Sequence, residues 1–166
     1  MNSLILIKLG QVYRTELLAK NSVNEMLDEN IFGRENRDCL MKFSSDHQEN
    51  LDGLTAIFET IRFSPSADTE LPEKVQRLLA LKNFPDRLFF SWLTEFESRL
   101  SDQYNQVSKL HERNPTVIPV DVWKTLEKVR HRQDLLAQEA AKVAHQTTGI
   151  LNTSDWELKL NSQSSG

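Results

Sequence analysis

Residues 86–148 read DRLFFSWLTEFESRLSDQYNQVSKLHERNPTVIPVDVWKTLEKVRHRQDLLAQEAAKVAHQTT, and they predict two long amphipathic helices joined by a short loop. Apolar residues in each half recur at alternating steps of four and three, which places them on one helix face. In the first helix this seam consists of Phe89, Leu93, Phe96, Leu100, Gln103, Val107 and Leu110. In the second helix it consists of Val122, Leu126, Val129, Gln133, Leu136, Ala140, Val143, Thr147 and Ile150.

Two prolines delimit the loop between these helices. Pro115 disfavours a helical conformation at Asn114, and Pro119 is compatible only with the start of a helix. A loop this short makes the two helices antiparallel neighbours. Both seams lack acidic residues, which argues against a di-metal site between these helices.

The remaining chain predicts three more helices. Residues 3–20 form the first, because the three-four spacing continues through Leu17; a strand over Leu4–Ile7 is the alternative. Residues 22–25 match a capping box and predict that a short helix restarts there. Residues 36–62 form a long helix in which Leu40, His47, Leu54 and Ile61 recur every seven residues. A polar connector, 64–72, precedes a short helix over 72–83.

Gly53 lies inside the 36–62 helix, where glycine costs roughly 1 kcal/mol relative to alanine. A close helix crossing and a mild kink both explain a glycine at this position.

The expected fold is all-α: an antiparallel bundle of about four main helices, over 3–20, 36–62, 86–113 and 120–148, with one or two short helices. One domain is expected over residues 1–160, followed by a flexible polar tail over 161–166. Within the last segment, Trp156, Leu158 and Leu160 alternate like a strand, while Ser154–Glu157 matches a capping box. Only five glycines and five prolines occur in 166 residues, which argues against an all-β fold.

Charge and cysteine content limit the class of protein. The net charge of -4 argues against a chain that binds polyanions nonspecifically over its whole surface. Cys39 is the only cysteine, which excludes an internal disulfide and favours a reducing, cytoplasmic location. The apolar run Leu4–Ile7 is too short for a membrane span or a signal peptide, so no membrane association is expected.

No catalytic, metal or cofactor site is predicted, and no small-molecule substrate is expected. His47 falls on an apolar seam and is interpreted as a core or boundary histidine with one hydrogen bond. Glu127 and His131 lie one helical turn apart, which favours a surface ion pair over a metal site. A di-metal bundle needs Glu-x-x-His on two helices, and that motif is absent from the sequence. Cys39 has no cysteine partner and is interpreted as a small buried or boundary residue.

Apolar residues at the loop between the two long helices form the first candidate surface, because loop tips normally face solvent. These residues either cap the bundle or contact a protein partner. The tail residue Trp156 poses the same choice. The candidate partner-binding residues are therefore Val117, Ile118, Val120, Trp123 and Trp156.

A basic face on the last long helix is the second candidate surface. Lys124, Lys128 and Arg132 step by four, and Arg130 lies beside them. These cations could follow a phosphate backbone while Trp123 stacks on a base; a solvated face paired with neighbouring acids is the alternative. The first hypothesis is a non-catalytic interaction or scaffolding subunit, working with a protein partner or as a homo-oligomer. The alternative is a small helical subunit of a nucleoprotein complex that contacts DNA or RNA.

Overall fold

The computed structural model describes residues 1–29, 32–81 and 84–147, and this part of the chain is built from helices without strands. The helices are α1 (Ser3–Glu29), α2 (Arg34–Ile61), α3 (Glu73–Leu81), α4 (Asp86–Arg113) and α5 (Val120–Thr147). The prediction of an all-α bundle with four long helices and a short one is confirmed. The predictions for Trp156, for the segment around it and for the tail over 161–166 lie outside the described residues.

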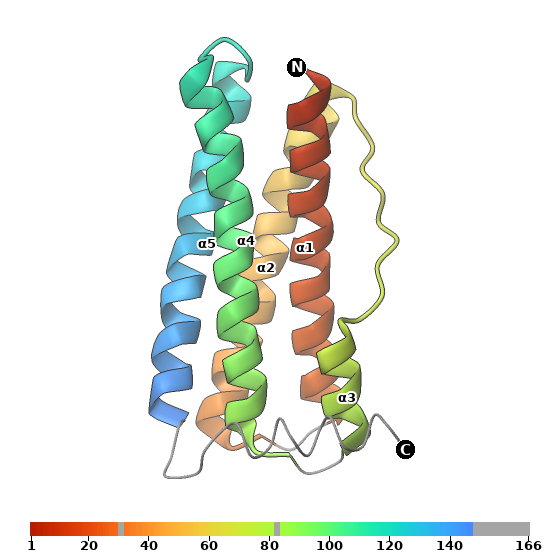
Figure 1. Ribbon diagram of the computed structural model, residues 1–166, viewed down its shortest axis with the longest axis vertical. Coiled ribbons are helices and arrows are strands. Elements are labelled where there is room, and N and C mark those ends of the chain that lie inside the picture. Colours follow the sequence, from red (N-terminus) through yellow and green to blue (C-terminus); the bar gives the residue numbers. More distant parts are fainter. Residues whose placement is uncertain (30–31, 82–83, 148–166) are drawn as a thin grey trace.

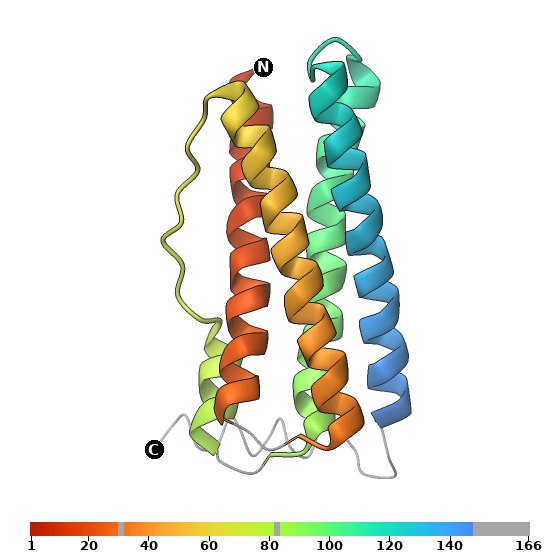
Figure 2. The same ribbon diagram turned by 180° about the vertical axis from the view of Figure 1, so that it is seen from behind.

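Two helical hairpins form the bundle. The α1–α2 hairpin packs beside the α4–α5 hairpin, with α1 against α4 and α2 against α5 (Figures 1 and 2). Helices α1 and α5 run in one direction, and α2 and α4 run in the other (Figure 1). Every pair of neighbouring long helices is therefore antiparallel, while the long helices on each diagonal are parallel.

This arrangement requires one long crossover between the hairpins. The connector after α2 returns along the length of the bundle outside α1 and leads to α3 (Figure 1). There α3 packs on α1 and α4, with Val75 and Leu78 buried. Helix α2 ends one residue earlier than expected because Arg62 adopts a left-handed conformation, with φ of 54°, that turns the chain outward.

The prediction that helix 3–20 ends and a short helix restarts at Ser22 is wrong. Helix α1 continues without a break to Glu29, and Ser22 is buried in its interior instead of capping a new helix. Ala19, Val23 and Met26 extend the apolar face of α1, so packing on the bundle outweighs the local capping signal.

Gly53 allows a close approach of α2 to α5. A Cβ placed on Gly53 would lie 2.6 Å from Cγ2 of Val129 on α5. No side chain larger than hydrogen fits there without movement, which supports the close-crossing interpretation of this glycine.

A polar layer divides the apolar core into two clusters at mid-height. One cluster gathers Val23, Leu40, Phe89 and Leu136 with their neighbours, and α3 joins it. The other gathers Leu9, Leu54, Val107 and Leu126 near the α4–α5 loop. Between them, each long helix contributes buried polar side chains to the layer: Glu16, His47, Asn50, Glu97 and Gln133.

Among the described residues, no helix combines the length and the apolar character that crossing a lipid bilayer would require.

Candidate functional site

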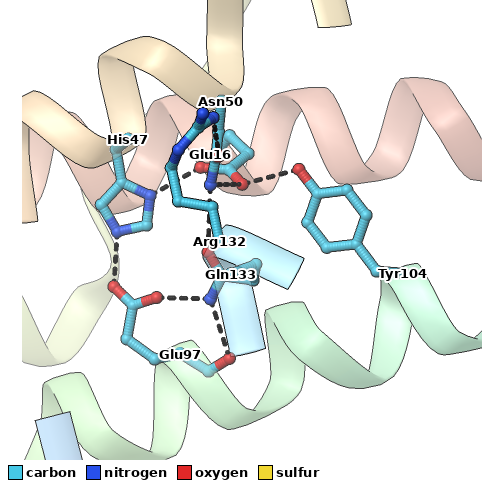
Figure 3. A network of polar contacts seen from close by, with 7 residues as sticks. All are labelled: Glu16, His47, Asn50, Glu97, Tyr104, Arg132 and Gln133. Carbon is cyan, nitrogen blue, oxygen red and sulfur yellow. Dashed lines mark hydrogen bonds and ion pairs between the residues drawn. The ribbon is translucent and has the colours of Figure 1, made fainter. Parts of the chain in front are cut away.

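His47 lies at the centre of the polar layer between two glutamates from different helices (Figure 3). Its Nδ1 is 2.6 Å from Oε2 of Glu16 on α1, and its Nε2 is 2.5 Å from Oε1 of Glu97 on α4. All three side chains are fully buried. The layer thus contains a buried Glu–His–Glu arrangement that joins three helices.

The two contacts determine the protonation state of His47. When both glutamates are ionised they can only accept hydrogen bonds, so both ring nitrogens donate and the ring is an imidazolium. Burial alone would lower the pKa of His47, but the charges of Glu97 and Glu16 and their hydrogen bonds raise this pKa to about 10. His47 therefore carries a positive charge at neutral pH.

The other carboxylate oxygens also accept hydrogen bonds. Oε1 of Glu16 accepts from the Tyr104 hydroxyl at 2.7 Å and from the Asn50 amide at 3.0 Å. Oε2 of Glu97 accepts from the Gln133 amide at 2.5 Å. All four carboxylate oxygens are therefore satisfied, as burial of two charges requires.

Arg132 closes the layer on the side of α5. Its guanidinium donates to the Asn50 side-chain oxygen at 3.0 Å and lies 3.2 Å from the carboxylate of Glu49. Asn50 thus links Arg132 to Glu16 (Figure 3). The buried charges of Glu16, Glu97 and His47 sum to -1, and the half-buried Arg132 adds a positive charge beside them that Glu49 shares.

The polar layer holds charges but does not present them to a ligand. Its glutamates and histidine are inaccessible to solvent, and both nitrogens of His47 act as donors, leaving no lone pair for a metal. In the described ranges, no group of three His, Cys, Asp or Glu side chains is arranged to hold a metal ion.

The sequence prediction captured the burial of His47 but not its surroundings. The expectation of one hydrogen bond was wrong, because two carboxylates contact the ring. The seam identified from the sequence contains no acid, but Glu97, one position after the seam residue Phe96, is also fully buried. A seven-residue spacing reveals both acids: Glu16 falls midway between Leu9 and Val23, and Glu97 between Phe90 and Tyr104, at heptad positions whose other members are buried.

The predicted partner-binding residues separate into two groups. Ile118 is buried, Val117 packs against the same core cluster, and Trp123 stacks on His111 with ring centroids 3.8 Å apart. These three side chains cap the bundle. Val120 is 68% exposed and remains available on the surface.

The four predicted phosphate-binding cations also separate. Arg130 donates to both carboxylate oxygens of Glu127 and to Asn105 on α4, so Glu127 pairs with Arg130 and the predicted Glu127–His131 pair is not found among the described contacts. Arg132 is held by α2, as described above. Lys124 and Lys128 point to solvent, and no carboxylate of the described residues forms an ion pair with either.

Exposed apolar side chains also occur where the sequence analysis had not placed a site. Leu4 and Ile7, one turn apart on α1, are 49% and 57% exposed, and Met1 lies beside them in sequence. The N-terminus of α1 lies at the same end of the bundle as the α4–α5 loop (Figure 1).

No family model matches the chain, and no match was found among curated proteins or solved structures.

Proposed function

We propose that this protein is a non-catalytic helical interaction subunit that docks on a protein partner, or on a second copy, through one end of its bundle. The observation that carries the proposal is the exposure of Leu4, Ile7 and Val120 at the end where α1 begins and the α4–α5 loop lies. Exposed apolar patches are typical of a protein interface, and Leu4 and Ile7 lie one turn apart on the same helix.

Helix α1 is apolar on two faces at this end. Ile5 and Leu9 fill the core, while Leu4 and Ile7 point away from it. A surface helix normally keeps its outer face polar, and a helix that is apolar all round is normally buried. A partner that covers Leu4 and Ile7 would restore that pattern.

Replacing both exposed residues tests the proposal. A Leu4→Gln/Ile7→Gln variant keeps good helix formers on α1 while removing the apolar surface. The matched control is Met41→Gln, because Met41 is 53% exposed on α2 and belongs to another surface. Circular dichroism establishes that all proteins are folded.

Light scattering and co-purification from the native source provide the measurements. We expect the wild type and Met41→Gln to form an oligomer or retain a stoichiometric partner, and the double variant to lose it. A wild type that is strictly monomeric and retains no partner overturns the proposal. So does a double variant that associates as the wild type does.

Contact with a nucleic-acid backbone is a second candidate function, favoured by the exposure of Lys124 and Lys128 one turn apart on α5. Gel shifts with single- and double-stranded DNA and RNA at two salt concentrations test it. Binding that disappears in Lys124→Glu/Lys128→Glu supports it, and no binding at low salt removes it.

A reducing intracellular compartment is proposed with either function, because Cys39 is a free thiol.

A further inference from the structure

The outward side of α5 carries a straight line of exposed residues. They step by four and three along the helix, which keeps them on one face over about 27 Å. The residues of this cationic line are Lys124, Lys128, His131, Leu135, Gln138 and Lys142. The line contains three lysines and no acid, in a chain whose net charge is -4.

The acids of α5 lie beside this line or at its start. Glu127 turns toward α4 and binds Arg130. Glu139 turns toward α2, where it lines a cavity of about 260 Å³ together with Cys39 and Phe43. Asp134 is half-buried. Asp121 is exposed and lies one step of three before Lys124, so it continues the same face at the first turn of the helix. An ordinary solvated helix face mixes both signs and pairs them one turn apart, whereas the exposed residues of this line from Lys124 to Lys142 include no acid.

Leu135 lies in the middle of the line and is 51% exposed. It is flanked by His131 and Gln138 one turn away on either side, with lysines beyond them. A single apolar side chain between cations can enter an apolar contact while the lysines pair with acids at its edges.

We propose that the cationic line of α5 docks an acidic amphipathic segment of a protein partner, with Leu135 as the apolar contact and Lys128 and Lys142 pairing with carboxylates on its two sides. This inference rests on the proposed function and adds a second surface to it, on a different helix from Leu4 and Ile7.

The described contacts favour a protein segment over a nucleic acid. The guanidinium groups of Arg130 and Arg132, which suit phosphate best, are engaged with Glu127 and Glu49. Trp123 is stacked on His111 and packs against the core cluster near the α4–α5 loop, so its ring is engaged within the bundle. Leu135 would also be buried against a charged phosphate backbone, which gains nothing from an apolar contact.

The direct test uses a fluorescein-labelled 20-residue helical peptide with leucine at three-four spacing and glutamate beside each leucine. The comparison ligands are the same peptide with glutamine in place of leucine, and a 20-nucleotide single-stranded DNA. Polarisation titrations of the full chain are run at 50 and 300 mM salt. Amide shifts in two-dimensional NMR locate the bound ligand.

We expect the leucine peptide to bind best, to bind more weakly at high salt, and to shift amides along the outer side of α5. Lys128→Glu/Lys142→Glu should weaken binding about tenfold, because two ion pairs are lost and two repulsions appear. Leu135→Gln should weaken it while leaving the salt dependence intact. Lys109→Glu, which makes half of this charge change at an exposed site on α4, should have little effect.

Two results overturn the inference. One is the absence of peptide binding at 50 mM salt. The other is tighter binding of the DNA than of the peptide together with no effect of Leu135→Gln, which assigns the line to nucleic acid. Leu4→Gln/Ile7→Gln should bind the peptide as the wild type does, so failure of this inference is distinguishable from failure of the docking proposal for the end of the bundle.

Discussion

Nε2 of His47 lies 2.5 Å from Oε1 of Glu97, and this contact joins α2 to α4 across the diagonal of the bundle. His47 belongs to the α1–α2 hairpin and Glu97 to the α4–α5 hairpin, so the contact joins the two hairpins. Apolar contacts tolerate a shift of one helix along another, whereas this contact and the one to Glu16 do not. A shift by one turn would leave buried carboxylates without donors, which is strongly unfavourable.

Removing the imidazolium should therefore destabilise the protein strongly. His47→Ala leaves two buried carboxylates facing each other, and breaking a buried ion pair costs about 3–5 kcal/mol. Urea denaturation at pH 7 measures the free energy of unfolding. Lys42→Ala, an exposed change on the same helix, is the control and should alter this free energy by less than about 0.5 kcal/mol. A loss below about 1 kcal/mol for His47→Ala would contradict the burial of charge in the layer.

Stability should fall at alkaline pH. The pKa of His47 is about 10 in the folded protein, whereas an unperturbed histidine, as in the unfolded chain, has a pKa of 6.5. The folded state therefore binds this proton more tightly than the unfolded chain does. The resulting stabilisation is fully present below about pH 6.5 and is lost as the pH rises through 10. Burial also raises the pKa of Tyr104, helped by the charge of Glu16, which adds a loss of stability in the same direction above about pH 10.

Urea titrations between pH 6 and 10.5 measure this dependence, and nitrogen NMR of the imidazole reports the proton directly. At pH 8 both ring nitrogens of His47 should be protonated. The slope of stability against pH between 7 and 10 should become shallower in His47→Gln. A neutral His47 ring at pH 8 would contradict the assignment.

The helices could be predicted from the sequence because the three-four spacing of apolar residues continues along each of them. The main error on α1 came from weighting the capping residues at Ser22 over the apolar spacing of Ala19, Val23 and Met26. Local capping contributes about 1 kcal/mol, whereas burial of a side chain such as Val23 or Met26 contributes about 1.5–3 kcal/mol. The tertiary contribution therefore decides the outcome.

The polar layer could be predicted only in part. Heptad spacing places Glu16, His47 and Glu97 on buried faces, but it does not show that the three faces meet at one height. Their common height depends on how the two hairpins align. The loop lengths and the crossover before α3 determine this alignment. The sequence also could not show which cations of α5 are engaged by other helices. Arg130 contacts Asn105 and Arg132 contacts Glu49 only once the helices have packed.

Two helical glycines should respond to alanine in opposite directions. At Gly53 a Cβ would collide with Val129 at 2.6 Å, so Gly53→Ala should destabilise the α2–α5 contact by about 1–3 kcal/mol. At Gly10 on α1 a Cβ meets no neighbouring atom within 4 Å, so Gly10→Ala should stabilise the protein by up to about 1 kcal/mol through helix propensity. Thermal and urea denaturation measure both.

Val129→Ala provides the matched test for the Gly53 prediction. It removes the atom that the new Cβ would meet, so Gly53→Ala should cost less in the Val129→Ala background than in the wild type. Equal costs in the two backgrounds would show that the α2–α5 approach is not the cause. Destabilisation by Gly10→Ala would contradict the open space beside that residue.

The thiol of Cys39 should react slowly in the folded protein. Burial raises its pKa to about 11, the charge of Glu139 adds to the rise, and Lys42 opposes it. Because the thiolate is the reactive form, the thiolate fraction at pH 8 should be lower than in the unfolded chain by about two orders of magnitude. Iodoacetamide labelling followed by mass measurement, in buffer and in denaturing urea, compares the two rates.

The charges beside Cys39 supply a test in two directions. Glu139→Gln removes the neighbour that raises the thiol pKa and should speed labelling. Lys42→Gln removes the neighbour that lowers the pKa and should slow it. Both residues line the α2–α5 cavity beside Cys39. A purely steric effect would therefore change the labelling rate in the same direction for both substitutions, whereas an effect of charge changes it in opposite directions. Equal labelling rates for the folded and unfolded wild type would show that the thiol is neither shielded by α5 nor held protonated.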